Sequence, residues 1–573
     1  MTAIITLLKR KYIVVVLLLA WMTWSLYLQF RADSFLGSNG EYPLAITQNG
    51  TYIGVRNHHF LQDMFLGMPY ALPPTGDLRF SIPHSNNVSW DGWKKAQAYG
   101  PHCLSYGKNR EKFTQSEDCL TINVVRPHVK GVQRLPVAVY LYGGGTTGGG
   151  SGDPRYNLSF IVSKSTAMGK PFVAVSLNYR SSVWGFVSGN DVNRTGNSNL
   201  GLRDQHFALQ WIQLNIEGFQ GDPSQVTIWG GSSGASDVGI HLIAHGGRDD
   251  GLFRAAIMQS GSPLVETSLR NLSPQQAYIQ LIRRANCFGV KDTLQCLRNI
   301  PFNELDHLID IISRDDPLTL DALSMPTLDG DIIRAFPSRQ LQTASLIRVP
   351  IIIGTTTNEG STFAPGGLEG PGRLERYLAG AWQLPDEIVQ KLLSLYPLSN
   401  NGTESSDFVA GLHDDIFFQA AALIGDLELI SSHRLTCETF ARYASCFSFR
   451  FDAVPSGGDT DLGPAAGVTH GAEIGPVFQN IEGVGFLRNP FLDQSLAYFM
   501  MADLIGVMWI NFITTLDPNG PSKAETAIRW PAYDLERPQN IVFSDSVPSF
   551  TELDTARSEA IQYINQINGV VGR

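Results

Sequence analysis

A serine with glycines two positions away on either side stands between a predicted strand and a predicted helix. The segment is GGSSG at residues 230–234, and it follows the strand-like apolar run at residues 226–229. Such a turn exposes a nucleophilic serine at a sheet edge, with glycines where side chains would collide with neighbouring backbone. The N–H of Ser233 and the start of the next helix would face a developing oxyanion. The pattern predicts acyl transfer through Ser232, with a tight turn of no function as the alternative.

A second glycine-rich stretch, residues 143–148, follows the apolar run at residues 135–142. It formally matches the G-x-G-x-x-G fingerprint of dinucleotide-binding proteins. The glycines continue to Gly152 and do not open a regular helix, so we reject that interpretation. The competing interpretation is an oxyanion loop, in which the N–H groups of Gly144 and Gly145 approach a tetrahedral intermediate. A flexible turn without function is the remaining alternative.

The segments around these motifs alternate between strands and helices. Continuous apolar runs, typical of strands buried on both faces of a parallel sheet, occur at residues 135–142, 172–177, 255–258 and 350–354. Residues 199–219 carry apolar side chains at helical spacing. The order strand, helix, strand, serine, helix predicts an α/β fold with a large, mostly parallel central sheet flanked by helices.

Several motifs together resemble the type-B carboxylesterase and cholinesterase-like family of α/β-hydrolases, in particular its fungal extracellular esterases and lipases. Besides the serine turn, they are GMPYA at residues 67–71, SEDCL at 116–120, YGGG at 142–145, GLRDQ at 201–205 and QSG at 259–261. The resemblance extends from about residue 40 to the C-terminus and implies an α/β-hydrolase fold with long insertions. It also implies that Glu359, in TNEGS, is the acid and that His470, in GVTHGAEI, is the base.

These residues would form a complete set for nucleophilic catalysis. A serine hydroxyl is a weak nucleophile at neutral pH, so it needs an imidazole to accept its proton and a carboxylate to orient that imidazole. Ser232, Glu359 and His470 follow the chain order of the α/β-hydrolases. We expect a serine esterase that cleaves small-molecule or lipid esters through an acyl-enzyme intermediate, without metal or cofactor. The alternative is a catalytically silent adhesion or binding ectodomain with the same fold.

Other ionisable residues near Ser232 are weaker candidates. His241 and His245 lie four apart on the following helix, but no glutamate follows the first, so a zinc pair is not expected. Many members of the resembling family carry Glu immediately before the nucleophile, whereas this chain has Gly231. We therefore expect neutral esters to be preferred over cationic ones, unless Asp237 or an aromatic cage replaces the missing charge.

The N-terminus predicts membrane targeting. A basic cluster at residues 9–11 precedes residues 12–30, nineteen residues without a charge, which is near the length that spans a bilayer. No small-x-small cleavage site follows this run. We expect residues 1–35 to be a cytosolic tail and uncleaved signal anchor, with a cleaved signal peptide as the alternative. Residues 36–573 would then form a single catalytic domain outside the cytosol.

Six cysteines, an even number, agree with the oxidising secretory pathway. Their local spacing predicts disulfides between Cys103 and Cys119 and between Cys287 and Cys296. The pairing of Cys437 with Cys446 is left open, because other connectivities are possible.

Composition and sequons agree with an extracellular globular domain. The chain is 43% hydrophobic and 17% charged, enough for a large core, and its formal net charge of −10 argues against nucleic acid as a partner. A sixth sequon, at Asn271, is followed by Pro274, which disfavours it. The other predicted N-glycosylation sites are Asn49, Asn87, Asn157, Asn193 and Asn401.

Overall fold

The structure is a computed structural model that describes most of the chain from Tyr42 to Arg573. Excluded are residues 1–41, 108–109, 111, 130–133, 265–272, 366–367, 369–371, 399–414, 458–465 and 521–527. The predicted anchor and the sequons at Asn271 and Asn401 therefore lie outside the described residues.

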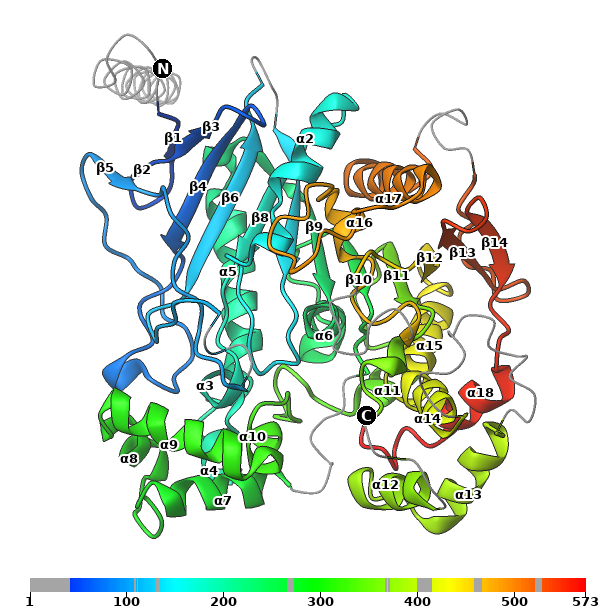
Figure 1. Ribbon diagram of the computed structural model, residues 1–573. Coiled ribbons are helices and arrows are strands. Elements are labelled where there is room, and N and C mark those ends of the chain that lie inside the picture. Colours follow the sequence, from blue (N-terminus) through cyan, green and yellow to red (C-terminus); the bar gives the residue numbers. More distant parts are fainter. Residues whose placement is uncertain are drawn as a thin grey trace, which may run out of the picture.

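An eleven-stranded sheet forms the centre of the molecule (Figure 1). In spatial order its strands are β14 (Phe550–Leu553), β13 (Gln539–Ser544), β12 (Cys446–Asp452), β11 (Ile351–Thr356), β10 (Ala255–Gln259), β9 (Gly221–Gly231), β7 (Leu135–Leu141), β8 (Val173–Leu177), β6 (Thr121–Pro127), β4 (Gln62–Pro69) and β3 (Val55–Asn57). The seven strands from β13 to β8 are parallel to their neighbours within this group, and the remaining strands pair antiparallel at the two edges. The predicted, mostly parallel α/β sheet is confirmed.

Helices cover both faces of this sheet, which is why strands such as β8 and β10 are buried and mostly apolar. On one face α2 (Ser159–Ala167) and α17 (Leu496–Thr515) contact each other and strands β6, β7 and β13. On the other, α5 (Leu200–Asn215), α6 (Ser233–Gly247) and α15 (Ser431–Phe440) contact β7 and β9 to β12. Every residue of β8 and β10 is buried, as expected for strands between two helical layers.

The predicted element boundaries differ from the structure by a few residues at most, with one exception. The expected helix at residues 199–219 is α5 followed by a 3₁₀ turn, Ile216–Phe219. Strand β9 begins at Gly221, before the apolar run on which the prediction rested. Gly221 pairs with Leu135, and the register shifts before Val137 pairs with Val226. Pairing with β7 therefore extends the strand through a segment whose composition is typical of a turn.

Long helical insertions lie beyond the carboxyl ends of the parallel strands (Figure 1). Between β10 and β11 they are α7 (Pro274–Arg284), α8 (Thr293–Asn299), α9 (Phe302–Asp315), α10 (Pro317–Leu323) and α11 (Pro337–Gln342). Between β11 and β12, ahead of α15, they are α12 (Arg373–Ala381), α13 (Asp386–Leu395) and α14 (Asp415–Gly425). Helices α7 to α10 share one apolar cluster and α12 to α14 share another, both separate from that of the sheet, whereas Leu341 of α11 belongs to the cluster of the sheet.

One helix of the described chain, α17, has the length and apolar composition of a membrane span. Its Trp509 and Phe512 are completely buried, and the Trp509 ring packs against Phe449 of β12 with centroids 5.3 Å apart. It is therefore a core helix of the sheet.

All six cysteines form disulfides. The structure joins Cys103 to Cys119 and Cys287 to Cys296, as expected, and also joins Cys437 to Cys446. The third bridge links α15 to the start of β12.

Candidate active site

Ser232 occupies the sharp turn between β9 and α6. Its backbone has φ 56° and ψ −132°, a conformation that residues other than glycine rarely adopt. Its N–H donates to the carbonyl oxygen of Gln259 at 2.8 Å, which ties the turn to β10. A Cβ on Gly230 would lie 2.3 Å from the carbonyl oxygen of Gly234, and one on Gly234 would lie 2.2 Å from that of Leu141. Close backbone contacts therefore require both glycines of the motif.

The three residues of the predicted triad lie within hydrogen-bonding distance of one another. His470 Nε2 is 2.8 Å from Ser232 Oγ, and His470 Nδ1 is 2.6 Å from Glu359 Oε2. Ser232 follows β9, Glu359 begins the 3₁₀ turn Glu359–Ser361 after β11, and His470 lies between β12 and α16 (Ile474–Phe478). Because parallel strands end at the same sheet edge, these distant segments converge there. The arrangement can move a proton from the serine hydroxyl to the imidazole.

Glu359 is completely buried and is held from several directions. Its Oε1 accepts hydrogen bonds from the Ser260 hydroxyl at 2.5 Å and from the Thr356 N–H at 2.8 Å, while Oε2 faces His470. The sequence does not predict this role for Ser260, because the QSG motif is informative only through the family resemblance. Its position two residues after the predicted strand at residues 255–258 is the signal that the sequence offers.

Burial and two neighbouring acidic residues, Glu359 and Glu473, affect the pKa of the His470 imidazole. Burial lowers the pKa of His470, but the adjacent Glu359 carboxylate outweighs this effect, so the pKa lies above its ordinary value of 6.5. Glu473, immediately before α16, is a further buried acid, and the sequence carries no local signal for its role. Its burial and the negative charge of Glu359 raise the pKa of Glu473 to about 7, and Gln259 donates to its Oε1 at 3.0 Å.

Backbone N–H groups beside Ser232 are available for an oxyanion. Ser233 is the first residue of α6, so its N–H has no partner within the helix. Gly144 and Gly145 have φ angles of 135° and 65°, and their N–H groups donate to no other described residue. A Cβ on Gly143 would lie 2.7 Å from the Ser232 Cβ, so the loop after β7 comes very close to the nucleophile.

The structure removes Asp237 as a source of charge for a substrate. Its side chain is completely buried, and Gln205 donates to its Oδ2 at 2.6 Å. Burial raises the pKa of Asp237 to about 7. The same glutamine lies 2.9 Å from the ring of His241, whose pKa is lowered to about 3 by burial. Both residues thus belong to a hydrogen-bonded core under α6, since they lie on its buried side.

His245 lies near the end of α6 and its Nδ1 is 3.1 Å from Asp331. Within the part of the chain that the structure describes, no group of three or more His, Cys, Asp or Glu side chains is arranged to hold a metal ion.

Four predicted glycosylation sites fall in described segments. Asn87 and Asn193 are exposed, whereas Asn49 and Asn157 are half-buried. The Nδ2 of Asn49 donates to two backbone carbonyl oxygens, at 2.7 and 3.3 Å.

A comparison with protein families decides the classification. Residues 42–558 match the model of the carboxylesterase family. The chain belongs to this family. Among its relatives, Lipase 4 of Diutina rugosa is 32% identical over 567 residues, which cover 92% of this chain and 96% of the relative. Secreted lipase 1 of Botryotinia fuckeliana is 31% identical and covers 82% of this chain and 84% of its own length.

Solved esterases have the same fold. The crystal structure of Aspergillus niger EstA aligns with a TM-score of 0.80 and 25% identity, over 94% of this chain and all of that one. A structure of PNB esterase aligns with a TM-score of 0.71 and 25% identity, over 90% of this chain and 99% of that one. This member of the carboxylesterase family is thus an α/β-hydrolase and a carboxylic ester hydrolase. The comparisons do not favour a catalytically silent ectodomain.

Proposed function

We propose that the enzyme cleaves neutral carboxylic esters with Ser232 as nucleophile, His470 as proton acceptor and Glu359 as the residue that orients His470. The observation that carries the proposal is the continuous hydrogen-bonded chain from Ser232 Oγ through both ring nitrogens of His470 to the buried Glu359, at 2.8 and 2.6 Å. This geometry is what a serine needs to become nucleophilic at neutral pH.

The reaction follows from the positions of these groups. Ser232 Oγ attacks the ester carbonyl carbon while His470 Nε2 takes the hydroxyl proton. The resulting oxyanion accepts hydrogen bonds from the N–H groups of Gly144, Gly145 and Ser233. The intermediate then collapses, the bond to the alcohol breaks, and the alcohol leaves with the proton from His470. Water attacks the acyl-serine by the same route, which releases the acid and restores Ser232.

The surroundings of the serine support a neutral substrate. Gly231 places no charge beside the nucleophile, and the nearest group to a Cβ at that position is the Tyr140 hydroxyl, at 3.3 Å. The Phe363 ring lies 4.9 Å from the His470 ring. Relatives named as lipases support a small-molecule or lipid ester as the substrate class.

The proposal includes the location and organisation of the enzyme. It operates in the secretory pathway with residues 36–573 as one catalytic domain, held at the membrane by residues 12–30 or released if that segment is cleaved. Three disulfides and the secreted lipase relatives support this location. In the same compartment Asn87, Asn157, Asn193 and Asn401 would be available for N-glycosylation. Modification of Asn49 would have to precede the two hydrogen bonds that its Nδ2 donates in the folded protein.

The test compares Ser232→Ala with the wild type on uncharged p-nitrophenyl esters of increasing acyl length. Loss of the nucleophile lowers kcat by about 10⁴- to 10⁶-fold. Ser236→Ala, in the same helix and outside the hydrogen-bonded chain, is the matched control. A fluorophosphonate probe should label Ser232 in the wild type only. An unchanged rate in Ser232→Ala would contradict the mechanism, and a wild type that neither hydrolyses esters nor takes up the probe would favour the binding ectodomain.

A further inference from the structure

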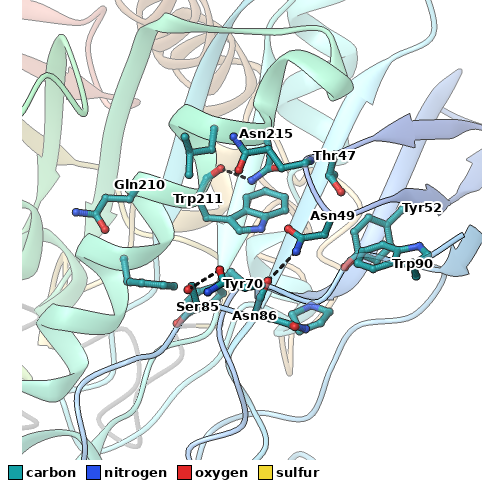
Figure 2. Close-up of a pocket in the computed structure, with 15 residues that line it drawn as sticks. Thr47, Asn49, Tyr52, Tyr70, Ser85, Asn86, Trp90, Gln210, Trp211 and Asn215 are labelled. Atoms are coloured by element: carbon teal, nitrogen blue, oxygen red, sulfur yellow. Dashed lines mark hydrogen bonds between the residues drawn. The ribbon is translucent and has the colours of Figure 1, made fainter. Parts of the chain in front are cut away.

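A cavity of about 250 Å³ lies between the N-terminal sheet and the second half of α5. The sheet consists of β1 (Leu44–Ile46), β2 (Thr51–Ile53) and β5 (Trp93–Lys95). Figure 2 shows side chains from β2, from the loops beside this sheet and from α5 gathered around one space. None of the residues that line it belongs to the hydrogen-bonded chain of Ser232 or to the predicted oxyanion loop.

The lining of this cavity is polar but carries no charge. Ten of its fifteen lining residues have amide or hydroxyl side chains, and none is Lys, Arg, His, Asp or Glu. A phosphate or carboxylate ligand would require a cationic partner. A cationic ligand would find no carboxylate in this lining and would be repelled by Lys94, whose ammonium lies 4.0 Å from the centroid of the Trp90 ring. An acyl chain would require mostly apolar walls. The remaining ligand class is neutral and rich in hydroxyl groups.

Two tryptophans line the same cavity, but Lys94 Nζ lies 4.0 Å from the ring centroid of Trp90, so Trp211 provides the free aromatic surface. Trp211 and Trp90 are both half-buried, and Figure 2 shows the Trp211 indole at the centre of the view between Asn215 and Tyr70. The Trp90 ring is held by a hydrogen bond from Nε1 to the Thr51 carbonyl oxygen at 3.2 Å. Indole rings bury apolar C–H faces while amides and hydroxyls beside them bind polar groups. A pyranose ring presents both kinds of surface.

Tyr52 supplies a hydrogen-bonding group that the protein itself does not use. Its side chain lines the cavity and is only 5% exposed. Burial raises its pKa to about 12, so the hydroxyl is neutral at physiological pH. It makes no hydrogen bond with another described residue. In contrast, the Tyr70 hydroxyl donates to the Asn178 carbonyl oxygen at 2.7 Å. The hydroxyl is not one of the fully buried polar atoms that lack a partner, so it remains accessible to a ligand hydroxyl.

We propose that this cavity binds a pyranose residue of a neutral carbohydrate. Two sources share that chemistry: a glycan attached to the protein itself, and a free oligosaccharide. Asn87 lines the cavity and is exposed, and Ser85 donates to its Oδ1 at 2.8 Å, which leaves Nδ2 for a glycosidic bond. The first of the two sources rests on the proposed glycosylation of Asn87.

The first experiment measures Tm for the wild type, Tyr52→Phe, Asn87→Gln and the double variant, all from a glycosylating host. If the bound sugar is the protein's own, Tyr52→Phe lowers the Tm of the glycosylated protein and has no effect in the Asn87→Gln background. Tyr443→Phe, an exposed tyrosine outside the cavity, is the control and should leave Tm unchanged in both backgrounds. Ester hydrolysis should be the same in all of these proteins, which separates the cavity from the triad.

The second experiment titrates the Asn87→Gln protein with N-acetylglucosamine, mannose and glucose oligomers by calorimetry. If the sugar comes from outside, one series binds, and Tyr52→Phe or Gln210→Ala weakens binding by about 5- to 10-fold, the effect of losing one hydrogen bond. Gln210→Ala changes an exposed side chain, so it is an independent check on folding. The proposal is overturned if no oligosaccharide binds at millimolar concentration and the four Tm values show no coupling.

Discussion

The Ser260 hydroxyl donates to Glu359 Oε1 at 2.5 Å, on the opposite side of the carboxylate from His470. Ser260 directly follows β10, the strand between those that lead to Ser232 and Glu359. Three adjacent parallel strands thus each deliver one residue to the same edge of the sheet, and His470 follows the fourth. The carboxylate that faces the imidazole is therefore also held by Ser260, which lies outside the hydrogen-bonded chain from Ser232 to Glu359.

Ser260→Ala should lower kcat by about 10- to 100-fold with little change in KM, because a hydrogen bond to a charged group contributes about 1.5–3 kcal/mol. Since Ser260 acts through Glu359, the effect should be much smaller in a Glu359→Gln background. Steady-state kinetics on the four proteins of this cycle measure the coupling. An equal loss in both backgrounds would show that Ser260 has another role.

The pH dependence of kcat/KM should report His470. The imidazole must be neutral to accept a proton, so activity rises with pH through its pKa, which lies above 6.5 because of Glu359. Glu359→Gln removes this charge, so the rise should move to lower pH while kcat falls. Glu473→Gln should move it in the same direction but by less, because its charge has the smaller effect on His470. Profiles from pH 5 to 9 that coincide for all three proteins would contradict this assignment.

The enzyme should discriminate against choline esters because of their positive charge. The wild type should have a higher kcat/KM for an uncharged ester than for an acylcholine of equal acyl length, because no carboxylate lies at position 231. Gly231→Glu should raise the acylcholine value relative to the neutral one, and Gly231→Gln controls for the added volume beside Tyr140. If the wild type has the higher kcat/KM for the acylcholine, an aromatic site must bind the cationic group, since Asp237 is buried in the core.

Deletion of residues 1–35 should give a soluble, active enzyme. Every residue proposed for chemistry lies after Leu141, and the described fold begins at Tyr42. Gel filtration and ester hydrolysis, compared with full-length protein in detergent, test this expectation. Aggregation or inactivity of the truncated chain alone would mean that the N-terminal segment contributes to the fold.

The sequence by itself determined the features that depend on local sterics and periodicity. Continuous apolar runs predict β7, β8, β10 and β11 because a strand between two helical layers must be apolar on both faces. The glycines around Ser232 predict the turn because each backbone contact there excludes a side chain. Glu359 and His470 were identified only through the resemblance, since neither has a local signature.

Only the tertiary structure decided how the distant segments meet. Ser232 and His470 are 238 positions apart, and His470 and Glu359 are 111 apart, so their contact depends on the strand order and not on spacing. Pairing with β7 extends β9 back to Gly221. Asp237, which the sequence offers as a possible charge for a substrate, is completely buried in the core. The contact of Ser260, the pKa of Glu473 and the uncharged cavity beside Tyr52 likewise depend on neighbours far away in the chain. Such contacts arise from tertiary packing, and the local spacing and periodicity of residues in the sequence do not predict it.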